Sequence, residues 1–293
     1  MMSPCCGIQP ETIHNYVISN HWKLRDNPEH TVEYFRCSNC GSLIMQPLPT
    51  AEEMASHFSL TYYRDTALID EISLSKAPKY DAVLNALSRL CPVPGSLLDV
   101  GCAHGYGLDI AGKYGWRPFG IDIDDEVFNY VKDKGYEVVK GCSVSDWVSS
   151  EKFDAILYMD ALYYFSNPFQ ELLMANQKLH TGGWLVLRVP LWGPLVSLLE
   201  RFSNLFGNNK TLHEYARHYL CDHLVVYSQQ GFEHSLQAAG FTLYHNAVDW
   251  GSGWRASDSL SAIFTRRARE VISSLSSVKI TPSMFYIARK ING

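Results

Sequence analysis

The sequence predicts an α/β protein with a doubly wound, seven-stranded and mostly parallel sheet, preceded by a small N-terminal metal-binding module. From residue 96 on, apolar segments of strand length alternate with helical segments. This alternation is typical of βαβ units whose sheet is covered on both faces. The first of these strands runs into a turn almost free of side chains, "DVGCAHGYG". The 293 residues, 46% of them hydrophobic, are enough to bury a large core.

Two helices are expected before this sheet begins. After the turn "QPLPT", one helix begins at Thr50, because Glu52 and Glu53 in its first turn favour a helix N-terminus. The second helix runs from Lys76 to Leu90 and ends at "CPVPG". We assign residues 1–50 to a zinc-knuckle-like module, 51–95 to a helical lid or linker, and 96–293 to the main domain.

The main domain then follows strand by strand. The predicted strands are Ser96–Asp99, Pro118–Ile121, Glu137–Lys140, Phe153–Tyr158, Trp184–Val189, Phe241–Ala247 and Ser283–Ala288. The predicted helices are Gly105–Tyr114, Asp125–Lys134, Phe169–Leu179 and Ser228–Ala239. Residues of about 190–217 form an insertion, whose apolar positions from Trp192 to Phe206 have helical spacing. This apolar stripe has three possible roles: it packs on the main domain, it forms a lid over the binding site for the substrate, or it forms a homodimer contact.

The turn after the first strand predicts a nucleoside ligand. Gly101, Ala103 and Gly105 keep the turn bare, and Asp122 follows at the end of the second strand, where an acid accepts ribose hydroxyls. The spacing is D-x-G-x-A-x-G and differs from the dinucleotide fingerprint G-x-G-x-x-G. Asp99 would repel a pyrophosphate, whereas it suits a cationic amino-acid group. Asp122 and Asp99 could instead serve as caps of the helices that follow them.

These features resemble motif I of class I S-adenosylmethionine-dependent methyltransferases, which have a Rossmann-like fold. The resemblance covers roughly Tyr62 to Lys290 and continues in "FDAILYMDALYYFSNP", "LHTGGWLVLRVP", "DHLVVYSQQGFEHSLQAAGF" and "SMFYIARK". The cysteine-bearing N-terminus followed by "QPLPT" resembles the zinc-carrying subset of bacterial small-molecule methyltransferases. S-adenosylmethionine is thereby implied as the cofactor. The implied cofactor-binding residues are Tyr63, Asp99, Gly101, Cys102, Ala103, Gly105, Asp122, Ile123, Cys142, Ser143, Val144, Tyr158, Met159 and Asp160.

The catalytic residues are harder to assign. Many relatives have L-E-H after the fourth strand, with the histidine as a candidate base, whereas this chain has Leu162-Tyr163-Tyr164. His223 in "DHLVVYS" is the first candidate for a general base, ahead of His213 and His218 in the insertion, although a lone histidine is also common as a structural residue. Tyr163 and Tyr164 either take part in the chemistry or shape an aromatic acceptor pocket.

The cysteines predict a structural zinc site. Cys37-Ser38-Asn39-Cys40-Gly41 is a Cys-x-x-Cys-Gly turn, in which two thiolates can face one ion and glycine supplies the positive φ. Cys5 and Cys6 are expected to complete the tetrahedral set with Cys37 and Cys40. The first knuckle is imperfect, so a histidine from the intervening segment could replace one of them. The alternative is that these are reduced cysteines that bind no metal.

Composition limits the partners. The net charge is −5 and the sequence pI is about 6.1, which gives no basic field for nucleic acid. The first 50 residues carry three positive and four negative charges. We expect a cytoplasmic protein without a membrane partner, because no signal peptide and no membrane-length apolar run is seen.

The predicted function is methyl transfer to a small molecule, with a hydroxyl of a sugar, polyketide or quinone-like acceptor favoured over carbon or nitrogen. The alternatives are a ribosomal RNA methyltransferase and a non-catalytic adenosylmethionine-binding protein.

Overall fold

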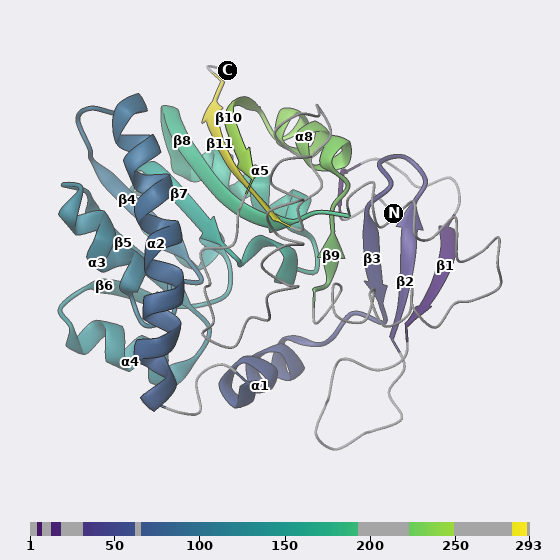
Figure 1. Cartoon of the computed structure of the whole chain (residues 1–293), viewed down its shortest axis with the longest axis horizontal. Helices are drawn as coiled ribbons and strands as arrows, with labels where there is room; N and C mark the ends of the chain where they lie inside the picture. The colour runs from purple at the N-terminus through teal and green to yellow at the C-terminus, as the bar shows by residue number, and fades with distance from the viewer. Residues whose placement is uncertain are drawn as a thin grey trace, which may run out of the picture.

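The computed structural model describes residues 5–7, 13–18, 32–61, 66–192, 223–248 and 283–291. Its centre is a seven-stranded sheet with the order β10-β11-β8-β7-β4-β5-β6 (Figure 1). The strands are β4 (Ser96–Val100), β5 (Arg117–Asp122), β6 (Glu137–Lys140), β7 (Phe153–Met159), β8 (Leu179–Pro190), β10 (Phe241–Val248) and β11 (Ser283–Lys290). The five strands from β8 to β6 run parallel, while β11 is antiparallel to both β8 and β10. The predicted doubly wound, mostly parallel sheet is confirmed.

The predicted helices are also present. They are α1 (Ala51–Thr61), α2 (Thr66–Leu90), α3 (Tyr106–Lys113), α4 (Asp125–Asp133), α5 (Pro168–Lys178) and α8 (Gln229–Ala238). Two short 3₁₀ turns, η1 (Val144–Asp146) and η2 (Leu162–Tyr164), follow β6 and β7. Helix α2 begins at Thr66 and not at Lys76 as predicted, so it is longer than its apolar pattern indicated. Strand β8 begins at Leu179 and not at Trp184 as predicted, so it includes the residues "LHTGG".

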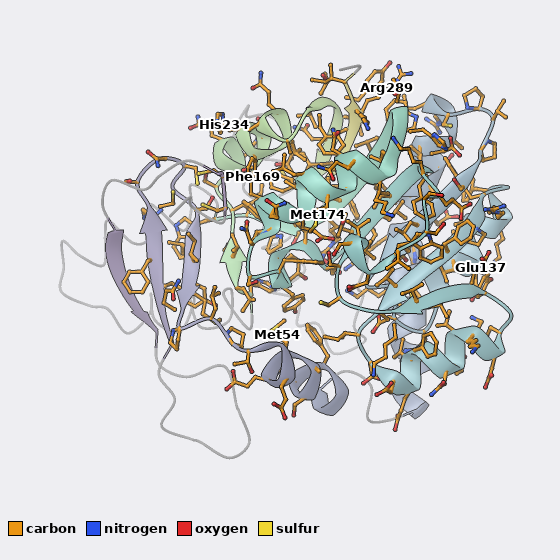
Figure 2. The ribbon with its side chains drawn as sticks, turned by 180° about the vertical axis from the view of Figure 1, so that it is seen from behind. Met54, Glu137, Phe169, Met174, His234 and Arg289 are labelled. Carbon is orange, nitrogen blue, oxygen red and sulfur yellow. The ribbon has the colours of Figure 1, made fainter. Side chains whose placement is uncertain are left out.

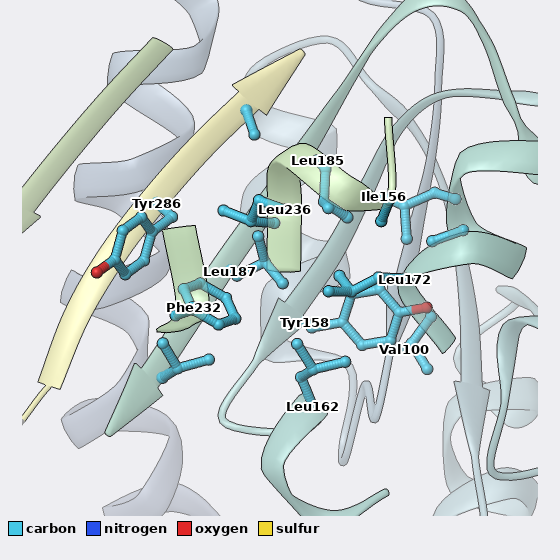
Figure 3. Packing of buried hydrophobic residues seen from close by; sticks show 14 of the residues in the cluster. Val100, Ile156, Tyr158, Leu162, Leu172, Leu185, Leu187, Phe232, Leu236 and Tyr286 are labelled. Carbon is cyan, nitrogen blue, oxygen red and sulfur yellow. The ribbon is translucent and has the colours of Figure 1, made fainter. Parts of the chain in front are cut away.

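The two faces of the sheet are covered by different helices. Side chains alternate along each strand, so Leu97 packs with α2 and α3 while its neighbour Leu98 faces α5 and α8. Figure 3 shows the second face, where Leu172 of α5 and Phe232 of α8 lie over the middle of the sheet. A core on both faces holds the carboxyl ends of the parallel strands rigidly at one edge.

The N-terminal residues form a second, four-stranded sheet that the sequence analysis did not predict. Its order is β1 (Ile13–Ile18), β2 (Val32–Cys37), β3 (Leu43–Gln46) and β9 (Val225–Val226). Strand β9 lies far along the chain, where it pairs Val226 with Leu43 and Val225 with Ile44. Figure 1 shows the small sheet beside the large one, with β9 on the side that faces it. The N-terminal sheet is therefore hydrogen-bonded to a segment of the main domain.

Some predicted features lie outside the described residues. These are Tyr63, His213, His218 and the insertion after Trp192, together with two of the intervening histidines, His21 and His30. In the part of the chain that the structure describes, no helix is both long enough and apolar enough to cross a bilayer.

Candidate cofactor, acceptor and metal sites

A cavity of about 240 Å³ opens at the carboxyl ends of β4, β5 and β7. This is the edge at which doubly wound sheets bind their ligands. The lining residues are Pro49, Met54, Phe58, Val100, Gly101, Asp122, Ile123, Gly141, Cys142, Asp160, Ala161, Tyr164, Phe165, Ser166 and Leu224. They come from α1 and the residues before it, from the ends of the parallel strands and the loops that follow them, and from Leu224, which directly precedes β9. Met54 lies on α1, between the two sheets in the view of Figure 2.

The turn after β4 has the backbone that its glycines predicted. Gly101 has a φ of 78°, and a Cβ atom there would lie only 3.0 Å from the Cβ of Ala161. A side chain at Gly107 would collide with the ring of Tyr80 and the carboxylate of Asp99. The bare turn therefore keeps α3, α2 and the strand ends close together, and it leaves the backbone open to a ligand.

Asp122 ends β5 as predicted and lines the cavity. Its carboxylate accepts hydrogen bonds from the backbone N–H groups of Ala103, at 2.8 Å, and Asp124, at 3.1 Å. Burial raises the pKa of Asp122 to about 6. The N-cap of α4 is Asp124, whose Oδ1 accepts from Glu126 and Val127. The alternative that Asp122 serves only as that cap is therefore wrong, and its oxygens have lone pairs left for ligand hydroxyls.

Asp99 is fully buried beneath the same turn. Its Oδ2 accepts a hydrogen bond of 2.9 Å from the Tyr80 hydroxyl, whereas Oδ1 has no hydrogen-bond partner among the described residues. Burial raises the pKa of Asp99 to about 7. The N-cap of α3 is Gly105, without a side-chain cap, so Asp99 does not cap that helix. A buried acceptor without a donor fits the ammonium group of an amino acid.

The loop after β6 is held from below by an acid that the sequence analysis missed. Glu171 of α5 is 1% exposed and accepts from the Ser143 hydroxyl at 2.6 Å, the Val144 N–H at 2.8 Å and the Tyr158 hydroxyl at 2.7 Å. Burial raises the pKa of the Glu171 carboxyl above its usual range. Cys142 is exposed toward the cavity, while Ser143 and Val144 turn to this acid. The sequence does contain a signal for Glu171, since it is a charged residue on the apolar face of a predicted helix.

Only some of the predicted cofactor-binding residues line the cavity. Gly101, Asp122, Ile123, Cys142 and Asp160 line the cavity. Tyr158 is fully buried, with its hydroxyl on Glu171, and Met159 is 7% exposed. Cys102 is buried against α3 and α4. The assignment of these residues to cofactor contacts stays a prediction.

The structure brings the three catalytic candidates together. The ring of His223 lies 4.2 Å from that of Tyr163 and 5.8 Å from that of Tyr164, measured between centroids. Tyr164 lines the cavity and meets the ring of Phe58 edge-on at 4.9 Å, whereas Tyr163 is 5% exposed and does not line it. The carbonyl of His223 accepts a 2.6 Å hydrogen bond from the Tyr34 hydroxyl of β2. The sequence alone could not reveal that β2 helps to place His223.

The four cysteines of the predicted metal site also meet. The sulfur atoms of Cys5, Cys6, Cys37 and Cys40 all lie within 4.8 Å of one another. The Cys5–Cys40 and Cys6–Cys37 sulfur distances are 3.3 and 3.9 Å. Ligands 2.3 Å from a tetrahedral zinc would be about 3.8 Å apart, so the arrangement fits that ion. Gly41 has the expected positive φ, 72°.

This cluster is built into the main domain. The Ser235 hydroxyl of α8 donates to the carbonyl of Cys5 at 2.7 Å, and the Ser228 hydroxyl donates to the carbonyl of Cys40. Gly7 packs against the ring of Phe169, which stands at the start of α5 (Figure 2). Hydrogen bonds with the neighbouring thiols, Cys37 above all, and then burial raise the pKa of Cys5 and of Cys40. Four such thiols are deprotonated together only with a cation among them.

Comparisons with known proteins agree with this geometry. A comparison with curated proteins gives no match. Similar solved structures include magnesium protoporphyrin IX methyltransferase from Synechocystis PCC 6803 with bound SAH, with 12% identity over 82% of this chain and 100% of that one, at a TM-score of 0.53. A putative methyltransferase in complex with the Trm112 activator from Haloferax volcanii has 16% identity over 82% and 98% of the chains, at a TM-score of 0.56. The plantazolicin methyltransferase BpumL in complex with SAH has 16% identity over 81% and 95%, at a TM-score of 0.50.

These structures establish the fold, and a family model establishes the family. The model described as a methyltransferase domain matches residues 74–246, which include the glycine turn, Asp99 before it, Asp122 after it and His223. The match covers more than half of the chain. The chain therefore belongs to the methyltransferase-domain family and has the class I fold of adenosylmethionine-dependent enzymes.

Proposed function

We propose that the protein transfers the methyl group of S-adenosylmethionine to a hydroxyl of a small metabolite, with polyketide or quinone-like acceptors preferred to sugars. The observation that carries this preference is the apolar part of the cavity. Its lining consists of Pro49, Met54, Phe58, Tyr164, Phe165 and Leu224, with Ser166 as the polar neighbour. Sugars are held by several hydrogen bonds, whereas this wall offers mainly rings and aliphatic groups among the described residues.

The remaining lining supports the cofactor assignment. Asp122 ends β5 and Ile123 follows it, where a ribose and an adenine would lie. Asp99 lies in β4, beneath the glycine turn. Adenosylmethionine, when bound, supplies an electrophilic methyl group on a sulfonium. The residues of the chain have to orient the acceptor in line with that group and to exclude water from it.

His223 is proposed as the group that accepts the hydroxyl proton. Its imidazole lies against both tyrosines, and its neighbour Leu224 lines the cavity. Its position is fixed by the Tyr34 hydrogen bond and by the Leu224 N–H, which donates to the Tyr163 carbonyl at 3.0 Å. A base at a fixed position contributes typically a hundredfold or more to a transfer of this kind. Tyr164 and Phe58 would hold the acceptor ring beside it.

The four-cysteine cluster is proposed as a structural zinc site. Cys5, Cys6, Cys37 and Cys40 have the number, spacing and burial of a closed tetrahedral site. The cluster does not line the cavity. Its proposed role is to fix the N-terminal strands against α8 and β9.

The test uses adenosylmethionine with a labelled methyl group. We expect label in the ether formed from 2-naphthol, a fused-ring phenol, and none in methyl glucoside. Phe58→Ala should raise the KM of the naphthol several-fold without changing the affinity for adenosylhomocysteine, because it removes one wall of the apolar part. Tyr244→Ala, at an exposed position of β10, is the matched control. Label in the sugar would overturn the acceptor preference, and label in ribosomal RNA fragments alone would favour the nucleic-acid alternative.

A further inference from the structure

The side chain of Ser42 connects the four-cysteine cluster to helix α8. Ser42 is fully buried, and its hydroxyl oxygen lies 3.2 Å from the sulfur of Cys40. The same oxygen accepts a hydrogen bond of 3.2 Å from the N–H of Ser228, which is the N-cap of α8. The Ser42 hydroxyl therefore stands between the beginning of this helix and one sulfur of the cluster.

The hydrogen bond between Cys40 and Ser42 has one possible direction when Cys40 ligates a metal. A neutral thiol can donate to the Ser42 oxygen, but a metal-ligating sulfur is a thiolate, which has no proton to donate. The Ser42 oxygen already accepts from the Ser228 N–H, so its own proton can point to the sulfur. In the thiolate form, Ser42 is therefore the donor and Cys40 the acceptor.

The start of α8 favours negative charge at the same place. A Cβ atom at Gly231 would lie only 2.8 Å from the Cβ of Cys40, so the first turn of α8 packs directly on this cysteine. The positive end of a helix dipole stabilises an anion beside it. Four thiolates around one divalent ion keep a net negative charge, and a charge inside a core needs hydrogen-bond donors.

Tyr227 supplies a second buried hydroxyl beside the cluster. Its side chain lies fully buried in the same core as Cys5, Cys6 and Cys37, and its hydroxyl has no hydrogen-bond partner among the described residues. Burial, followed by the charges of Cys5, Cys40 and Cys6, raises the pKa of this hydroxyl. A buried hydroxyl without an acceptor destabilises a protein, and thiolates beside it would provide the acceptor.

We propose that Ser42 and Tyr227 donate hydrogen bonds to the thiolates of the metal site, Ser42 to Cys40 and Tyr227 to a neighbouring ligand sulfur. Such donors orient the ligands of a metal and strengthen its binding. Ser42 directly precedes β3, and Tyr227 directly follows β9, the strand with which β3 pairs. The two hydroxyls would thus tie the site to both strands and to the start of α8. The proposal rests on the zinc site of the proposed function, and it is independent of the acceptor.

The test of Ser42 measures metal binding by the full chain, first with zinc and then with cobalt as a spectroscopic substitute. Ser42→Ala keeps all four sulfur ligands, and we expect it to weaken zinc binding about tenfold or more, the usual effect of losing a hydrogen-bond partner of a metal ligand. In the cobalt form, the sulfur-to-cobalt charge-transfer band should move to lower energy, because a thiolate without its donor gives up an electron more readily. The d–d bands of tetrahedral cobalt should remain.

Tyr227→Phe removes only the hydroxyl and gives a test by sign. A hydroxyl without an acceptor is unfavourable, so its removal would raise the thermal stability of the zinc-loaded protein. A hydroxyl that donates to a thiolate is favourable, so we expect Tyr227→Phe to lower this stability and to weaken zinc binding several-fold. Higher stability with unchanged zinc binding would overturn the role of Tyr227.

Ser235→Ala is the matched control. Ser235 of α8 is also fully buried, but its hydroxyl donates to the carbonyls of Cys5 and Gly231 and not to a sulfur. We expect Ser235→Ala to leave the zinc affinity and the cobalt band unchanged. Unchanged values in Ser42→Ala, or equal changes in Ser42→Ala and Ser235→Ala, would overturn the role of Ser42 while the zinc site stands. Wild-type protein that binds neither zinc nor cobalt would overturn the zinc site as well.

Discussion

At the scale of single residues, two buried acids lie at the proposed cofactor site, Asp122 in the lining of the cavity and Asp99 beneath the glycine turn. Asp122 is the last residue of β5, and Asp99 is the last but one of the neighbouring strand β4. Asp122 accepts a hydrogen bond from the Ala103 N–H, and Asp99 accepts one from the Tyr80 hydroxyl. Their positions were predictable because motif spacing and strand ends depend on local sequence. Three contacts were not predictable, because each joins residues that are far apart in the chain and that only the fold brings near. They are Lys76 with Asp160, 84 residues apart, Glu171 with Val144, 27 residues apart, and Tyr34 with His223, 189 residues apart.

Removal of the Asp122 carboxylate should weaken cofactor binding. Asp122→Ala deletes the acceptor proposed for the ribose hydroxyls and also the partner of the Ala103 N–H. We expect a loss of roughly 1.5–3 kcal/mol in the binding free energy of adenosylmethionine, the range for hydrogen bonds to a charged group. Calorimetry with adenosylhomocysteine checks this value. Unchanged affinity would remove Asp122 from the binding site.

The pH dependence of binding should follow Asp99 and Asp122. Burial raises their pKa values to about 7 and about 6, so both carboxyls take up protons as the pH falls from 8 to 5.5. A protonated Asp99 no longer attracts an ammonium group. We therefore expect the affinity for adenosylhomocysteine to fall over this interval, and Asp99→Asn to flatten the dependence near pH 7. The same raised pKa values mean that the folded state binds more protons than the unfolded state between pH 4 and 7. These two groups therefore contribute stability at the acid end of this range and lose it as the pH rises.

At the scale of elements, the regular βαβ part was predictable and the N-terminal sheet was not. Helices α3, α4, α5 and α8 carry clear apolar faces and caps, such as Ser228 before α8, whose hydroxyl accepts from Gly231. Strand β9 has only two residues, so no periodicity could indicate it. Strands β1 and β2 do contain β-branched and aromatic residues, a signal that the cysteine pattern obscured.

His223, just before β9, and Tyr164 of η2 should determine the rate of the chemical step. His223→Ala removes the proposed base beside the two tyrosines, and we expect the rate to fall about a hundredfold or more with little change in cofactor affinity. Tyr164→Phe should reduce the rate modestly, because the ring that meets Phe58 remains. Tyr164→Ala should cost far more. Single-turnover kinetics with saturating adenosylmethionine separate these effects from product release. A full rate in His223→Ala would leave alignment as the source of the rate, whereas equal losses in Tyr164→Phe and Tyr164→Ala would identify the phenol as the proton acceptor.

The loop between β6 and η1 depends on helix α5 through one carboxylate. Glu171→Gln keeps the size and one oxygen for the Val144 N–H and the Tyr158 hydroxyl, but it removes the charge and puts an NH₂ donor where Oε2 accepts from the Ser143 hydroxyl. We expect about 1–3 kcal/mol lower stability in urea unfolding, and a several-fold higher Kd for adenosylhomocysteine as the loop loosens. Glu126→Gln, at an exposed position of α4, is the control. A stable variant with normal affinity would show that the loop is held by Asp146 alone, which accepts from the Cys142 and Ser143 N–H groups.

At the scale of the whole molecule, the four-cysteine cluster and the proposed acceptor site are joined by one short path. The Cys37–Cys40 turn connects β2 to β3, and β3 pairs with β9, which directly follows His223 and Leu224. The Met45 N–H also donates to the Leu224 carbonyl at 2.9 Å. The proposed nucleoside site, by contrast, depends on β4, β5 and β6. Loss of the cluster should therefore affect the two halves of the cavity unequally.

Replacing one cysteine of the cluster should reveal this unequal effect. Cys40→Ser should abolish the binding of one equivalent of zinc and loosen the N-terminal sheet, because the four sulfur atoms no longer share an ion. We expect a sharply reduced rate and a raised KM for the acceptor, with the affinity for adenosylhomocysteine changed by less than about twofold, since the cofactor half keeps its own core. Elemental analysis, calorimetry and acceptor kinetics on the same preparation measure the three quantities. Cys91→Ser replaces a cysteine outside the cluster and should change none of them. Equal loss of cofactor and acceptor binding in Cys40→Ser would show that the N-terminal sheet and the seven-stranded domain unfold as one unit, whereas full activity without zinc would separate the cluster from the acceptor site altogether.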